Sequence, residues 1–172
     1  LVNAGNANAF TGRAGEASVK RCADAVAAAC GCAPEMVLLA STGVIGEPLD
    51  DSRLTGHLPE MMDNLSPASW DAAAEAIRTT DTFAKGASAT AVVDGKSITV
   101  TGIAKGSGMV APDMATMLAF IATDAAIETA TLNQITQQAV DASFNAITVD
   151  SDTSTSYTVL VLAIGGAGNA AI

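Results

Sequence analysis

The segment from Ala87 to Ile103 reads ASATAVVDGKSITVTGI and predicts a β-hairpin. Its two strand-like arms are Ala87–Val93 and Ser97–Ile103, and Asp94-Gly95-Lys96 lies between them. An Asp-Gly pair tolerates the positive φ angles of a tight type I′ turn. We therefore expect two antiparallel strands joined by this turn.

More strands and helices are predicted on both sides of the hairpin. Downstream, we expect a strand over 116–123, an amphipathic helix over 131–145 and a strand over 158–164. Upstream, we expect a helix over 14–30 that ends at Gly31, a buried strand over 36–40 that leads into a loop at 41–43, a short helix from 51 or 52 interrupted at Pro59, and a helix over 66–78. The fold class is therefore α+β, a layered α/β sandwich read as one domain segment over 1–172.

Composition limits the function classes. The chain has 172 residues and a formal net charge of −10. This negative charge excludes electrostatic binding to nucleic acid or to an anionic membrane. Hydrophobic residues make up 49% and charged residues 15%, so a packed core is expected rather than disorder. No apolar run approaches the roughly 18 residues of a membrane helix. We therefore expect a cytoplasmic protein.

Two further features of the sequence concern its extent and its cysteines. Strand-like residues lie at both ends of the chain, so we expect a longer polypeptide to contain it. The three cysteines, Cys22, Cys30 and Cys32, form no CxxC pair and have no histidine nearby. Neither a disulfide framework nor a zinc site is indicated, and no metal is predicted.

The densest cluster of unusual residues runs from Lys105 to Leu118 and reads KGSGMVAPDMATML. A phosphate-binding P-loop would place the lysine after the glycines and a helix next, so it is rejected. The hydroxyl of Thr116 could instead attack the Ala115 carbonyl, and the freed α-amine could then act as a base for that hydroxyl. Asp113 is a candidate for polarising water during this cleavage. The simpler interpretation is a threonine that favours a strand start.

These residues resemble the self-cleavage segment of the ornithine acetyltransferases of arginine biosynthesis, also called glutamate N-acetyltransferases. Other stretches agree with the family in the right order, so the resemblance covers nearly the whole chain. They are VNAGNANAFTG over 2–12, STGVIG over 41–46, TTDT over 79–82, SFNAITVD over 143–150 and DTST over 152–155. The resemblance implies the family's fold, related to the N-terminal-nucleophile aminopeptidases, and a chain divided into an α part, 1–115, and the start of a β part, 116–172.

The resemblance also implies a chemistry. The precursor cuts itself between Ala115 and Thr116, and Thr116 then carries acetyl from N-acetylornithine to glutamate as an ester. Thr42 and Gly43 would form the oxyanion hole. Lys105 and a threonine of the Thr79-Thr80 pair, taken as Thr79, would contact substrate together with Thr116. No organic cofactor is implied. Assembly of the α and β fragments into a higher oligomer is implied, and use of acetyl-CoA as a second acetyl donor is left open.

Several alternatives remain. The family reads Asp-Gly-Asp where this chain has Ser151, which puts the backbone turn there in question. An amidase or aminopeptidase with an N-terminal nucleophile would share the fold but tends to use serine. A non-catalytic fragment is another alternative. The run Gly165-Gly-Ala-Gly-Asn-Ala-Ala171 contains G-x-G-x-x-A and could suggest a dinucleotide-binding module. The asparagines Asn3, Asn6 and Asn8 are read as structural residues of turns.

Overall fold

The computed structural model describes residues 1–112, 116–154 and 156–172. It divides into two compact units, Leu1–Ser69 and Trp70–Ile172, and each is considered by itself. The predicted division into an α part, 1–115, and a β part, 116–172, describes a break in the peptide chain. The two compact units do not test it, so it stays a prediction. Mixed helices and sheets confirm the α+β fold class.

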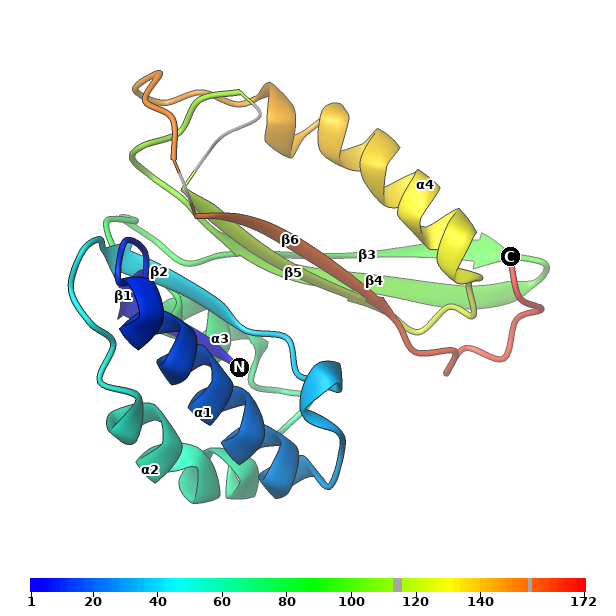
Figure 1. The fold of residues 1–172 in the computed structure, drawn as a ribbon. Helices are drawn as coiled ribbons and strands as arrows, with labels where there is room; N and C mark the ends of the chain where they lie inside the picture. Colours follow the sequence, from blue (N-terminus) through cyan, green and yellow to red (C-terminus); the bar gives the residue numbers. More distant parts are fainter. Residues whose placement is uncertain (113–115, 155) are drawn as a thin grey trace. The chain divides into compact units, whose positions relative to one another are not determined.

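Unit 1 is a parallel strand pair with helices packed beside it (Figure 1). Helix α1 connects β1 to β2, as a parallel pair requires a crossover, and α2 packs on α1. Arg21 of α1 and Asp51 of α2 form an ion pair across the two helices, with 2.6 Å between Nη2 and Oδ2. The elements are β1 (Val2–Asn6), α1 (Gly12–Cys30), η1 (Pro34–Met36), β2 (Ala40–Val44) and α2 (Asp51–Asp63).

Unit 2 is built on a four-stranded sheet in the order β3-β4-β5-β6, with α4 running along it (Figure 1). The first two pairs are antiparallel, and β5 pairs with β6 in parallel through the α4 crossover. Leu118 and Ala119 of β5 are fully buried, so this strand forms the middle of the core. The elements are α3 (Trp70–Ala76), β3 (Lys85–Val93), β4 (Lys96–Lys105), β5 (Met117–Thr123), α4 (Thr129–Asp141), η2 (Phe144–Ala146) and β6 (Tyr157–Ala163).

Local sequence signals predicted the turns well. Val93 pairs with Lys96 across a two-residue turn in which both Asp94 and Gly95 have positive φ, so the hairpin is confirmed. Gly31 ends α1 in the left-handed conformation, and its N–H bonds to the Ala27 carbonyl.

Three expectations in unit 1 were wrong. The strand predicted over 36–40 begins only at Ala40, so Ser41, Thr42 and Gly43 lie in β2 and not in a loop. Pairing with β1 explains the shift, because each residue from 40 to 44 lies in register with a residue of β1. Helix α2 also continues through Pro59. The three- and four-residue spacing of apolar residues over 14–30 would also place Cys30 on the buried face of α1, but Cys30 is exposed.

Candidate active site

Lys105 and Thr79 lie together at the end of β4. Lys105 is the last residue of that strand and is only 2% exposed, and its Nζ donates a hydrogen bond to Thr79 Oγ1 at 2.7 Å. Burial lowers the pKa of Lys105, the charge of Asp81 opposes this, and the charge of Lys85 adds to it. The sequence prediction named Thr79 and Lys105 as substrate contacts, and the structure brings them together.

Asp81 organises the surroundings of this pair. Its side chain accepts hydrogen bonds from Lys85 Nζ, from the Gly106 N–H at 2.8 Å and from the Thr79 N–H at 3.4 Å. Burial, at 5% exposure, works to raise the pKa of Asp81, but the hydrogen bond from Lys85 and those from the backbone outweigh it, so the net pKa is lowered. Sequence reasoning quoted Asp81 within the TTDT stretch but gave it no role.

Thr116 lies immediately before β5, where its backbone and side chain are both held. Its N–H donates to the Met109 carbonyl at 2.6 Å. Its hydroxyl donates to Ser154 Oγ, and Ser154 is itself buried. The candidate nucleophile therefore sits in a defined hydrogen-bonded position, and Ala115, the other side of the expected cut, lies outside the described residues, as does Asp113.

A close backbone approach links Lys105 to Thr116. Gly106 has φ of 153°, and a Cβ built on it would lie 3.1 Å from the Thr116 carbonyl oxygen. Lys105 pairs in register with Leu118, two residues after Thr116. Thr79, Lys105 and Thr116 are therefore gathered at one end of the sheet of unit 2.

The loop before Thr116 is fastened by Asp150. Its carboxylate accepts hydrogen bonds from the N–H groups of Met109 at 2.7 Å and Val110 at 2.9 Å, and these bonds hold the pKa of Asp150 below its ordinary value. Met109 has φ of 56°, a conformation that few residues other than glycine adopt readily. Ser151 also has a positive φ, 63°, so the chain makes a left-handed turn there with a residue other than glycine.

Thr42 and Gly43, the predicted oxyanion hole, belong to unit 1 and lie in β2. Thr42 has no exposed surface. Gly43 has φ of 129°, and a Cβ built on it would lie 2.3 Å from the carbonyl carbon of Gly5, so only glycine fits. Their role in an oxyanion hole stays a prediction.

The asparagines of the opening loop make structural hydrogen bonds, as expected. Asn3 accepts one from Ser41 Oγ at 2.6 Å, Asn6 donates to the Glu47 carbonyl at 3.0 Å, and Asn8 donates to the Gly15 carbonyl at 3.1 Å. The glycine run after β6 behaves differently from a dinucleotide fingerprint. Residues 164–172 form no helix, and Asn169 bonds instead to Ala126.

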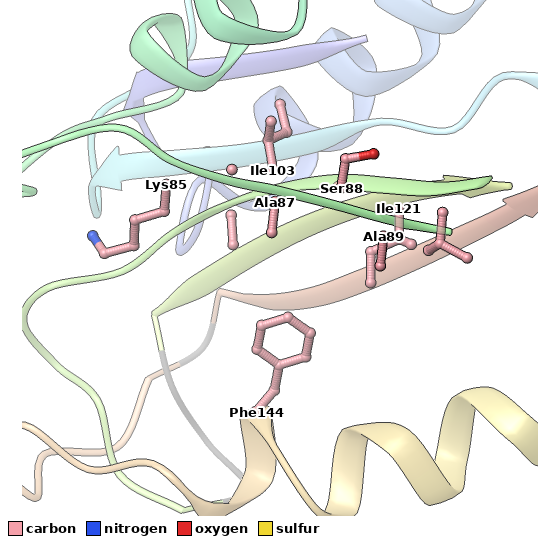
Figure 2. A pocket seen from close by; sticks show the side chains of 11 residues that line it. Lys85, Ala87, Ser88, Ala89, Ile103, Ile121 and Phe144 are labelled. Atoms are coloured by element: carbon pink, nitrogen blue, oxygen red, sulfur yellow. The ribbon is translucent and has the colours of Figure 1, made fainter. Parts of the chain in front are cut away.

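Two hollows lie on the sheet of unit 2, and both are apolar. One of about 460 Å³ is lined mainly by β3 and β4, and Phe144 points toward these strands from η2 (Figure 2). Another of about 390 Å³ lies between α4 and the sheet. Lys85, the ion-pair partner of Asp81, is among the residues that line the first hollow.

The described part of the chain shows neither a candidate metal site nor a helix that could cross a membrane. Residues 1–112, 116–154 and 156–172 contain no group of three or more His, Cys, Asp or Glu side chains arranged to hold a metal ion. In the same ranges, every helix is too short or too polar to cross a membrane.

Comparisons with known proteins give one consistent result. The model of the ArgJ family matches residues 1–171. A protein of Caulobacter vibrioides named arginine biosynthesis bifunctional protein ArgJ is 54% identical over 168 residues, which are 98% of this chain and 42% of that protein. A protein of the same name from Ruegeria pomeroyi is 53% identical, over 98% of this chain and 41% of that protein. The chain thus spans about two fifths of these relatives.

A solved structure is similar as well. The crystal structure of arginine biosynthesis bifunctional protein ArgJ from Bacillus halodurans has a TM-score of 0.58 and 39% sequence identity to this chain. The match covers 66% of this chain and 60% of that one. Fold and sequence therefore lead to the same family.

Proposed function

The chain belongs to the ArgJ family, and from this premise we propose that Thr116 is the nucleophile of an acetyl transfer from N-acetylornithine to glutamate. Because the chain spans about two fifths of its relatives, the activity is proposed for the full-length protein that contains it. The observation that carries the proposal is the gathering of Thr116, Lys105 and Thr79 at one end of the sheet.

The first step is self-cleavage. Thr116 Oγ bonds to the Ala115 carbonyl carbon, the 115–116 C–N bond breaks, and the hydroxyl proton passes to the Thr116 nitrogen. Water then hydrolyses the resulting ester, which leaves an Ala115 carboxyl group and a free Thr116 α-amine. The glycine turn at Gly106 and the Asp150 contacts support this step, because they fix the backbone that leads to the cut.

The second step is acetyl transfer in two halves. Thr116 Oγ attacks the acetyl carbonyl of N-acetylornithine, its proton is taken by the α-amine and given to the departing ornithine nitrogen, and an acetyl ester remains. The amine of glutamate then attacks this ester, and the Thr116 hydroxyl is restored. Neither half needs a metal or an organic cofactor.

Four residues are proposed to assist. The ammonium of Lys105 suits the α-carboxylate of an amino-acid substrate, with Thr79 holding that ammonium in place. The Thr42 hydroxyl and the Gly43 N–H would stabilise the tetrahedral oxyanion, since donors fixed before the reaction point where charge develops. Cytoplasmic location, assembly of the two fragments into an oligomer and acetyl-CoA as a second donor belong to the same proposal.

The test uses the chain extended to the length of its relatives, with Thr116→Ala as its control. Intact mass and N-terminal sequencing should find a fragment that begins Thr116-Met-Leu-Ala, absent from the variant. Incubation with N-acetylornithine should then add one acetyl group to that fragment. An extended chain that stays uncut and transfers no acetyl would overturn the proposal, and amide hydrolysis without transfer to glutamate would favour the amidase alternative.

A further inference from the structure

We propose that Ser154 is a further catalytic residue, whose Oγ accepts the hydroxyl hydrogen of Thr116 and thereby aims the nucleophile. This inference rests on the proposed role of Thr116. It starts from one contact, the hydrogen bond from Thr116 Oγ1 to Ser154 Oγ, which joins residues 38 positions apart in the chain. Ser154 is 4% exposed, so water has little access to replace that contact.

Ser154 is itself held by the backbone. Its Oγ accepts a hydrogen bond from the Ser156 N–H at 3.1 Å, and the Ser156 carbonyl accepts one from the Met117 N–H at 3.2 Å. Met117 follows Thr116 and pairs with Tyr157 in the parallel β5–β6 ladder. The contact from Thr116 to Ser154 therefore closes a ring through Ser156 and Met117, and this ring adjoins the first pair of the β5–β6 ladder, Met117 with Tyr157.

The hydrogen bonds that Ser154 Oγ already accepts determine which role it can take toward Thr116. A hydroxyl has one hydrogen and two acceptor lone pairs. The Ser156 N–H, which can only donate, uses one lone pair, and the Thr116 hydroxyl uses the other. Ser154 therefore accepts from Thr116 and retains its own hydrogen throughout.

This arrangement has a chemical consequence for Thr116. With its hydrogen directed at Ser154, the lone pairs of Thr116 Oγ point elsewhere, toward an incoming carbonyl carbon. As the new C–O bond forms, the Thr116 hydroxyl becomes more acidic and its hydrogen bond to Ser154 strengthens. A serine hydroxyl is too weak a base to keep the proton, so the proton still ends on the amine nitrogen, as in the proposed steps. Ser154 is thus expected to help both self-cleavage and acetyl transfer, because the nucleophile is the same.

The test compares Ser154→Ala with wild type in the extended chain. Self-cleavage should slow by about 10- to 100-fold, the range expected when a reacting atom loses its orientation. After complete cleavage, kcat for acetyl transfer should fall by a similar factor while KM for glutamate stays within about twofold. The matched control is Ser88→Ala, because Ser88 Oγ forms a comparable hydroxyl contact with Thr101 at 2.8 Å on the exposed face of the hairpin. Ser88→Ala should leave both rates unchanged.

Ser154→Thr and Ser154→Cys separate orientation from packing, with thermal unfolding measured for every variant. Ser154→Thr keeps the hydroxyl and should keep most of the rate, whereas Ser154→Cys keeps the size but accepts hydrogen bonds weakly and should be slow. Wild-type rates in Ser154→Ala, full rates in Ser154→Cys, or a raised KM with unchanged kcat would each overturn the proposal. If wild type does not cut itself, the proposed function fails and this inference with it; if wild type cuts and Ser154→Ala cuts equally fast, only this inference fails.

Discussion

The two parallel strand pairs, β1–β2 in unit 1 and β5–β6 in unit 2, present candidate site residues by different physical means. Near Thr42, close packing of backbone against backbone holds the strands together. Gly43 lies directly against Gly5, and a side chain at position 43 would have no space. Near Thr116, polar side chains hold the backbone in place. Asp81, Asp150 and Ser154 all form hydrogen bonds with Thr116 or with segments close to it. The first arrangement should be sensitive to added volume and insensitive to pH, whereas the second should depend on pH because the carboxylates of Asp81 and Asp150 hold it.

Gly43→Ala should give the largest loss of stability. The added Cβ would lie 2.3 Å from Gly5, and a positive φ adds strain, so we expect a loss of about 4 kcal/mol from overpacking and backbone strain together. Urea unfolding of the extended chain measures it, and the loss should be the same at pH 4 and pH 8.

Gly46→Ala is the matched control for that loss. Gly46 also has a positive φ, but no atom lies within 4 Å of a Cβ built there, so this variant carries the strain alone and should lose about 1 to 2 kcal/mol. Equal losses at the two glycines would contradict a backbone-packed site at Gly43.

Asp81→Asn should give the second-largest loss of stability, and the size of that loss should depend on pH. Asp81 is buried while its partner Lys85 is about a third exposed, so weakening the acceptor for Lys85 and for the Gly106 and Thr79 N–H groups should cost about 2 kcal/mol at neutral pH. The pKa of Asp81 is lowered by folding, so its stabilisation is complete above the unfolded value of about 4 and is lost as pH falls through the lower folded value. The difference between wild type and variant in urea unfolding should therefore shrink from pH 7 to pH 3.

Asp94→Asn provides the control for Asp81, because it removes the same charge at an exposed turn whose positive φ asparagine tolerates. It should change stability by less than about 0.5 kcal/mol at either pH. If Asp81→Asn were equally mild and without pH dependence, Asp81 would not hold the Lys105 end of the sheet.

Ser151→Gly should give the smallest change in stability, and this change should be a stabilisation rather than a loss. Glycine relieves the left-handed strain at φ of 63° but gains freedom in the unfolded chain, so we expect a net stabilisation of about 0.5 kcal/mol. Thermal unfolding beside Ser151→Ala measures it, since alanine keeps the strain and should not stabilise. A destabilising glycine would show that the serine makes a contact worth more than its strain.

Sequence reasoning found the features that local chemistry decides. Asp94-Gly95 and Gly31 encode their own turns. The roles of Thr116 and Lys105 came instead from the resemblance to a family, and they stay predictions. Sequence reasoning missed Asp150 and Ser154 because their partners lie about 40 residues away, and no spacing rule connects such positions. It placed Thr42 in a loop for the same reason, since the strand that extends through it is set by distant β1.

The sheet order of unit 2 also bears on how this chain behaves at high concentration. β6 is an outer strand whose neighbour in the described sheet is β5, and its sequence YTVLVLA has no charge and no proline. Outer strands of this kind expose a row of backbone donors and acceptors, which pairs readily with strands of other molecules. A sample of residues 1–172 alone is therefore expected to self-associate through β6 at high concentration, beside the point where the Ser156 carbonyl accepts a hydrogen bond from the Met117 N–H.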